Sequence, residues 1–85
     1  MVRVHKLMAH PSYIPFRVLH RACVDRNLSV TLQIFDGGET VTIKDGSGMQ
    51  IYRVTREYGH TENAPAAAMQ WLIENDYISS GDVEG

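Results

Sequence analysis

Two glycine-containing turns divide residues 29–56 into three stretches, and this spacing constrains the fold more than any other feature. In the stretch Ser29–Phe35, Val30, Leu32 and Ile34 alternate with the other side chains. This pattern is typical of a strand with one buried face. The turns at residues 36–39 and 45–48 contain glycines, which tolerate positive φ angles. Because connections this short join antiparallel neighbours, we expect an antiparallel three-stranded meander.

The third stretch, Met49–Arg56, has two mixed faces when the alternation runs without interruption. Tyr52 and Val54 then share a face with the polar Gln50 and with Arg56. A β-bulge near Tyr52 would bring the apolar side chains together on one face. The other residues expected to face the core are Val30, Leu32 and Ile34 in the first stretch, and Val41 and Ile43 in the second, Thr40–Lys44.

Apolar residues at helical spacing precede the sheet and predict a helix over about residues 13–26. Ser12 is the expected N-cap, and Pro15 would lie in the first turn, where its missing N–H costs nothing. Asn27 is a candidate C-cap. The stripe expected to face the core consists of Ile14, Val18, Leu19, Ala22 and Cys23.

A second helix is expected after the break at residues 58–60. Either Thr61 or Asn63 would cap it, and Pro65 falls within its first turn. Its expected buried stripe consists of Ala68, Met69, Leu72 and Ile73, with Trp71 at the margin. Two helices packed on the one apolar face of the sheet would complete the core.

The predicted fold is therefore an α+β two-layer sandwich of order (β)-α-β-β-β-α in a single domain, residues 1–85. The leading strand would be a short edge strand at residues 2–6, and residues 79–85 would form a flexible tail. Double-stranded-RNA-binding domains resemble this order of elements. Their second helix opens with a lysine cluster, whereas residues 61–65 contain an acid and no base. The resemblance therefore extends to topology alone.

Composition excludes several classes of protein. The single cysteine, Cys23, excludes an internal disulfide framework. No apolar run approaches the roughly 18–20 residues of a membrane span, and the first residues lack the apolar segment of a secretory signal. We expect a cytoplasmic protein that does not interact with membranes.

Catalytic and metal-binding motifs are equally sparse. His20 and Cys23 lie three residues apart, which is half of a zinc site or a thiol beside a base. The glycine turns lack the lysine of a phosphate loop and the carboxylates of a calcium loop. No pair of carboxylates suggests acid–base catalysis. We therefore expect no enzyme activity, no cofactor and no metal.

Charge is distributed unevenly along a chain of net charge −2. Residues 61–85 contain five acidic and no basic residues. Arg17 and Arg21 are spaced to share one helical face, where they would suit phosphate contacts. A pI near 6.0 is low for a nucleic-acid-binding domain. Nucleic-acid binding is therefore the alternative hypothesis, with Arg3, Lys6, Arg17, Arg21 and Arg26 as the candidate phosphate ligands.

Aromatic and arginine side chains along the third stretch favour protein binding, because these residue types are enriched at interaction hot spots. Phe35 points away from the apolar face of its strand, and some of Tyr52 or Arg53 would line the same uncovered face. An edge strand would also allow pairing with a second copy into a homodimer.

We expect a small protein-binding inhibitor or adaptor that occupies a partner's surface, of a kind found in phages and mobile elements. The predicted contacts are Phe35, Tyr52, Arg53, Arg56 and Tyr58, with Glu62, Glu74 and Asp76 as a second, acidic patch.

Overall fold

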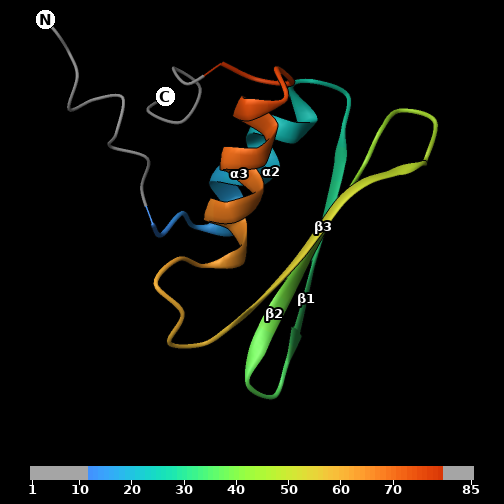
Figure 1. The fold of residues 1–85 in the computed structure, drawn as a ribbon. Helices are drawn as coiled ribbons and strands as arrows, with labels where there is room; N and C mark the ends of the chain where they lie inside the picture. The colour runs from blue at the N-terminus through green and yellow to red at the C-terminus, as the bar shows by residue number, and fades with distance from the viewer. Residues whose placement is uncertain (1–11, 80–85) are drawn as a thin grey trace, which may run out of the picture.

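The computed structural model describes residues 12–79, which fold into a three-stranded antiparallel sheet and two helices packed on one of its faces (Figure 1). The predicted α+β architecture is confirmed. In chain order the elements are α2 (Phe16–Val24), β1 (Ser29–Phe35), β2 (Gly38–Lys44), β3 (Gln50–Glu57) and α3 (Ala64–Glu74).

The strands form a meander with β2 in the centre, as the two short turns predict. Phe35 pairs with Gly38 across the first turn, and the register then continues without interruption to Ser29 and Lys44. Because side chains alternate along each strand, the sheet has two distinct faces. We call the face beneath the helices the covered face and the opposite one the open face.

A β-bulge in β3 lies next to Tyr52, close to its predicted position. Ile43 pairs with Tyr52 and the following Lys44 pairs with Gln50, so Ile51 is the extra residue. The extra residue places Gln50 with the open-face side chains, while Tyr52 and Val54 join Ile43 on the covered face. One inserted residue thus separates Gln50 from the apolar side chains, while Arg56 stays with them on the covered face.

The core lies between the covered face and the two helices. Its fully buried side chains come from all three parts, with Leu19 from α2, Val41 and Ile43 from β2, and Met69 and Leu72 from α3. The first turns of α3 are also buried, and their small side chains let this helix lie close against its neighbours. These small residues are Ala64, Pro65, Ala66, Ala67 and Ala68.

The first helix begins later than predicted, and Ser12 does not cap it. Pro15 occupies the N-cap position of α2 and forms no side-chain capping bond. Ile14 precedes Pro15, and a residue before a proline is disfavoured in helical backbone. The Asn63 side chain also holds Ile14, accepting a hydrogen bond from its N–H (3.2 Å) and donating one to its carbonyl (2.9 Å). The Asn63 N–H also donates to the Ser12 carbonyl (3.0 Å). These bonds tie the Ser12–Ile14 backbone to the start of α3, before the helix begins.

The same Asn63 side chain caps α3 by accepting a bond from the Ala66 N–H (3.0 Å), which settles the choice between Thr61 and Asn63. At the other end of the first helix, α2 closes at Asp25, and Asn27 adopts a positive φ of 61° two residues later. Asn27 thus reverses the chain into β1, close to its expected role.

The predicted strand at residues 2–6, all but the first residue of the predicted tail at 79–85, and the candidate phosphate ligands Arg3 and Lys6 lie outside the described residues. Within residues 12–79, no helix combines the length and the apolarity needed to cross a membrane.

Candidate protein-binding surface

The five predicted contact residues do not share one surface. Phe35 and Arg53 lie on the open face, whereas Tyr52 and Arg56 lie on the covered face, because the bulge sets the register of β3. Tyr58 follows the end of β3, where its N–H donates to the Gly37 carbonyl (2.9 Å). Of the two residues expected beside Phe35 on the uncovered face, Arg53 lies there and Tyr52 does not.

Tyr52 packs inside the molecule. Its ring stacks on Trp71 of α3, with 4.6 Å between centroids, and Trp71 stacks in turn on Tyr77 at 5.5 Å. Burial raises the pKa of Tyr52, and nearby Arg56 opposes that shift. The three rings connect the sheet, α3 and the turn that follows α3, so the role of Tyr52 in this structure is packing.

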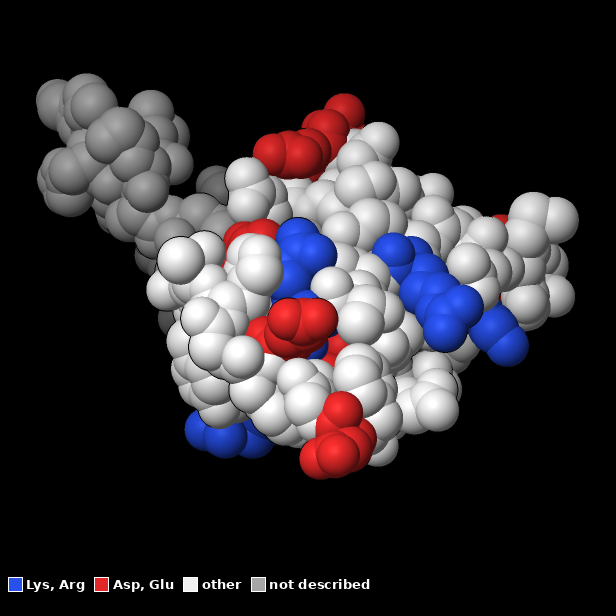
Figure 2. Space-filling view, turned by 60° about the horizontal axis from the view of Figure 1, so that its bottom comes forward, with Lys and Arg blue, Asp and Glu red and all other residues white. Residues whose placement is uncertain are grey.

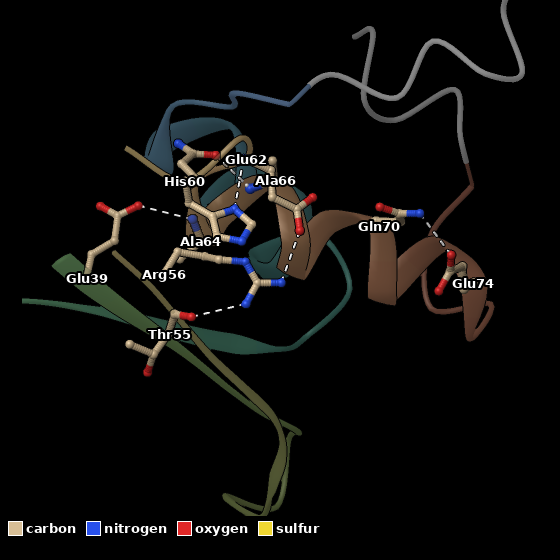
Figure 3. Close-up of polar contacts among 10 residues, drawn as sticks. Glu39, Thr55, Arg56, His60, Glu62, Ala64, Ala66, Gln70 and Glu74 are labelled. Carbon is tan, nitrogen blue, oxygen red and sulfur yellow. Dashed lines mark hydrogen bonds and ion pairs between the residues drawn. The ribbon is translucent and has the colours of Figure 1, made fainter. Parts of the chain in front are cut away.

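Arg56 is likewise bound within the molecule (Figure 3). Its Nη2 lies 3.0 Å from Glu62 Oε1, and its Nη1 donates to the Thr55 carbonyl at 3.1 Å. The side chains of the ion pair are only about a quarter exposed, at 28% and 25%. Glu39 lies opposite Arg56 on β2 and accepts a bond from the Ala64 N–H, the first amide of α3, at 3.1 Å. These bonds join the end of the sheet to the N-terminus of α3.

The three residues of the predicted acidic patch lie at different ends of α3. Glu62 precedes the helix and pairs with Arg56, whereas Glu74 ends the helix and accepts a bond from Gln70 at 3.0 Å (Figure 3). Asp76 lies in the following turn with a positive φ of 64°. The helix between the two ends spans about 16 Å, so the acids do not form one patch.

The chain matches no protein-family model, no curated protein and no solved structure. The physical properties of the surface therefore carry the functional argument.

The open face is polar apart from one aromatic ring. Its central rows consist of threonines, a glutamine and Arg53, and Thr40 and Thr55 share a hydrogen bond of 2.8 Å between their hydroxyls. Phe35 lies over Gly38, where a Cβ atom would stand 3.0 Å from the ring and 2.6 Å from the Arg56 carbonyl oxygen. The glycine thus provides the space in which the Phe35 ring rests, and the ring keeps 40% of its surface exposed.

Three of the seven exposed large apolar side chains among the described residues lie at the end of the sheet where β1 turns into β2, and the other four lie elsewhere, at Tyr13, Val24, Met49 and Tyr77. Phe35 is 40% exposed, Tyr58 is 58% exposed, and Ile34 on the opposite face from Phe35 is 66% exposed. The sequence predicts Ile34 in the core, because it alternates in register with Val30 and Leu32. The strand extends beyond the helices at this end (Figure 1), so the covered face is no longer covered there.

The basic side chains of α2 point to solvent. Arg17, His20 and Arg21 are all exposed, and Arg26 just after the helix is exposed as well. Phe16, the nearest aromatic residue, packs against the core. On the face seen in Figure 2, basic and acidic side chains of the described residues are interspersed, without a broad area of one sign.

Cys23 and His20 lie on different sides of α2. Cys23 is fully buried, and burial raises the pKa of its thiol to about 11, which keeps it protonated at neutral pH. His20 is exposed and contacts the ring of Phe16. Among the described residues, no three His, Cys, Asp or Glu side chains gather as a metal site would require.

The second glycine turn is held by its own aspartate. Asp45 Oδ1 accepts bonds from the Ser47 N–H (2.9 Å), the Ser47 hydroxyl (2.6 Å) and the Met49 N–H (3.0 Å). The bond from the Ser47 hydroxyl contributes most to lowering the pKa of this carboxyl group, followed by the Met49 N–H. Asp45 therefore serves as the acceptor that shapes a hairpin turn.

Proposed function

We propose that this domain is a non-enzymatic protein-binding module that docks on its partner through the hairpin end of the sheet. We define the hairpin end as Phe35 and Tyr58, with Arg53 farther along the open face. One observation carries the proposal: two aromatic side chains remain 40% and 58% exposed around a single two-residue turn. Aromatic residues are enriched at protein interfaces, and tyrosine and arginine are among the residue types most enriched at hot spots.

The rigid setting of these side chains supports the same proposal. Phe35 rests on Gly38, and Tyr58 is held by the backbone bond to Gly37, so both aromatic residues sit on ordered backbone. Binding then loses little conformational freedom, which favours affinity. Around them the open face offers neutral hydroxyl and amide groups suited to an interface rim. The matching partner surface would present an apolar pocket, with a carboxylate for Arg53.

A module of this kind acts by occupying a surface, as inhibitors and adaptors do. Site-specific photo-crosslinking in the source cells provides the test. A benzophenone amino acid at position 58 should yield a discrete crosslinked protein, and Phe35→Ser in the same chain should abolish it. Position 49 is the matched control, because Met49 is 66% exposed and adjoins the opposite turn of the sheet. Equal crosslinking from both positions, or none from position 58, would refute the proposal.

A second candidate function is nucleic-acid binding, favoured by the exposure of both Arg17 and Arg21 on α2. Two phosphate contacts would make binding weaken as salt rises. Titration of labelled DNA and RNA at low and at moderate salt tests it. Arg17→Gln/Arg21→Gln should reduce any affinity and flatten its salt dependence, and absence of binding at low salt excludes this function.

A further inference from the structure

The outer edge of β1 carries backbone groups that the sheet does not use. Phe35 and Gly38 flank a two-residue turn, so they form a hydrogen-bonded pair, and alternate residues along β1 face β2 in the same way. Val30, Leu32 and Ile34 therefore direct their N–H and C=O groups away from β2. Among the described residues, no element pairs with this edge, because the sheet order is β1-β2-β3.

The sequence of β1 offers no protection against pairing. The strand, Ser-Val-Thr-Leu-Gln-Ile-Phe, contains no charge, no proline and no bulge. Proteins usually protect exposed edges with one or more of these features. The other edge strand, β3, has two of them, because Arg53, Arg56 and Glu57 are charged and a bulge lies at Ile51. The two edges of one sheet thus differ in their capacity to accept another strand.

The pattern of β1 is also symmetric about Leu32. Apolar residues stand two positions to either side of it, Val30 and Ile34, and neutral polar residues stand one position to either side, Thr31 and Gln33. A strand with this symmetry matches itself when it is turned end to end. Antiparallel pairing about Leu32 would then place apolar against apolar on the covered face and polar against polar on the open face.

We propose that β1 pairs antiparallel with β1 of a second copy, with Leu32 opposite the partner's Leu32, so that two sheets become one across a twofold axis. Val30 then lies opposite the partner's Ile34, and each such pair exchanges two backbone hydrogen bonds. Thr31 lies opposite the partner's Gln33. Ile34, 66% exposed in the single chain, gains an apolar neighbour on a part of the sheet that a helix covers.

This inference is separate from the proposed docking on another protein. Arg53 and Tyr58 belong to the opposite edge of the sheet, and Phe35, although it ends β1, directs its backbone groups toward β2. The decisive test uses charge at Thr31 and Gln33, whose side chains are exposed on the open face and outside the core. Thr31→Lys/Gln33→Lys places like charges opposite each other twice in the dimer. Thr31→Glu/Gln33→Lys is the matched control, because the same register sets opposite charges together.

Sedimentation equilibrium of the full chain should show a dimer for the wild type and for the control. The Lys/Lys variant should dimerise about tenfold more weakly or not at all. Mixing Thr31→Lys/Gln33→Lys with Thr31→Glu/Gln33→Glu should restore a one-to-one heterodimer. Circular dichroism verifies that each variant is folded.

A wild-type protein that stays monomeric would overturn the proposal. This holds whatever segment pairs with the outer edge of β1, residues 2–6 of the same chain included. Equal dimerisation of the Lys/Lys variant and the control would also overturn it. Should the charged variants misfold, Ile34→Pro against Ile34→Ala gives the same decision, because only proline removes the outward N–H. A Lys/Lys variant that loses the dimer but keeps the crosslink from position 58 separates this proposal from the proposed function.

Discussion

Neighbouring residues of β2 show how differently the two faces of the sheet are used. Val41 and Ile43 are fully buried on the covered face, whereas Thr42 between them stays partly exposed on the open face. The same backbone supports both sets of side chains. The covered face holds the helices through apolar contact, whereas most side chains of the open face are accessible, apart from Thr40, which is buried and bonded to Thr55. Substitutions at adjacent positions of one strand should therefore differ strongly in their effect on stability.

The largest effect is expected from placing a charge beneath the helices. Leu19→Asp or Leu72→Asp buries an unpaired carboxylate among fully buried neighbours and should cost more than about 4 kcal/mol, enough to unfold so small a domain. Gln50→Asp, exposed on the open face opposite Lys44, is the control and should leave the melting curve nearly unchanged. A cooperative thermal transition in either leucine variant, followed by circular dichroism, would contradict the assigned packing.

Shortening two adjacent side chains of β2 to alanine tests the difference between the two faces. Ile43→Ala removes a fully buried side chain and should cost about 2–5 kcal/mol. Thr42→Ala should cost within about 1 kcal/mol, because its side chain is partly exposed on the open face. Urea denaturation measures both. Similar losses would mean that the open face also contributes packing to the core.

The attachment of the helices should depend on Asn63 more than on other caps. Asn63→Ala removes the cap on Ala66 and both bonds to Ile14, and should cost about 1–2 kcal/mol. Asn75→Ala is the matched control, since its side chain makes one exposed bond to the Trp71 carbonyl. We expect a clearly smaller loss there. Equal losses in urea denaturation would show that the link between α3 and residues 12–14 contributes little.

The last comparison concerns a pH dependence from Cys23, which is confined to alkaline solution. Because burial raises the pKa of its thiol from 9.0 to about 11, the unfolded thiol ionises first as the pH rises. The contribution to stability is present below pH 9 and declines between pH 9 and 11. The wild type should therefore lose more stability than Cys23→Ala over this interval. If stability falls equally with pH in the two proteins, the Cys23 thiol is accessible to water in the folded protein.

Local patterns were sufficient to predict the fold of residues 12–79. Alternation and two glycine turns determine the meander, and the apolar stripes place Leu19 and Leu72 beneath the helices. The first helix begins later than predicted, although Pro15 by itself disfavours helical backbone at the preceding Ile14. The bonds between Asn63 and the Ile14 backbone could not be predicted, because the two residues lie 49 positions apart.

The candidate surface was predicted less well than the fold. The inserted residue Ile51 determines the face on which Tyr52 lies, because the alternation of side chains between the two faces of β3 shifts there by one position. Aromatic and arginine residue types suggest an interface equally well when they pack internally, as Tyr52 and Arg56 do. Ile34 matches the core pattern, yet its exposure depends on how far the helices reach along the sheet. How far the helices reach along the sheet follows from three-dimensional packing, and the alternation of apolar residues in the sequence does not reveal it.

The aromatic stack has a practical consequence for studying this protein. Trp71 is the single tryptophan of the chain, and it lies between Tyr52 of the sheet and Tyr77 beyond α3. Its intrinsic fluorescence therefore reports whether the segment after α3 remains packed against Trp71. Excitation of this one indole could follow release of that segment in real time, without any attached dye.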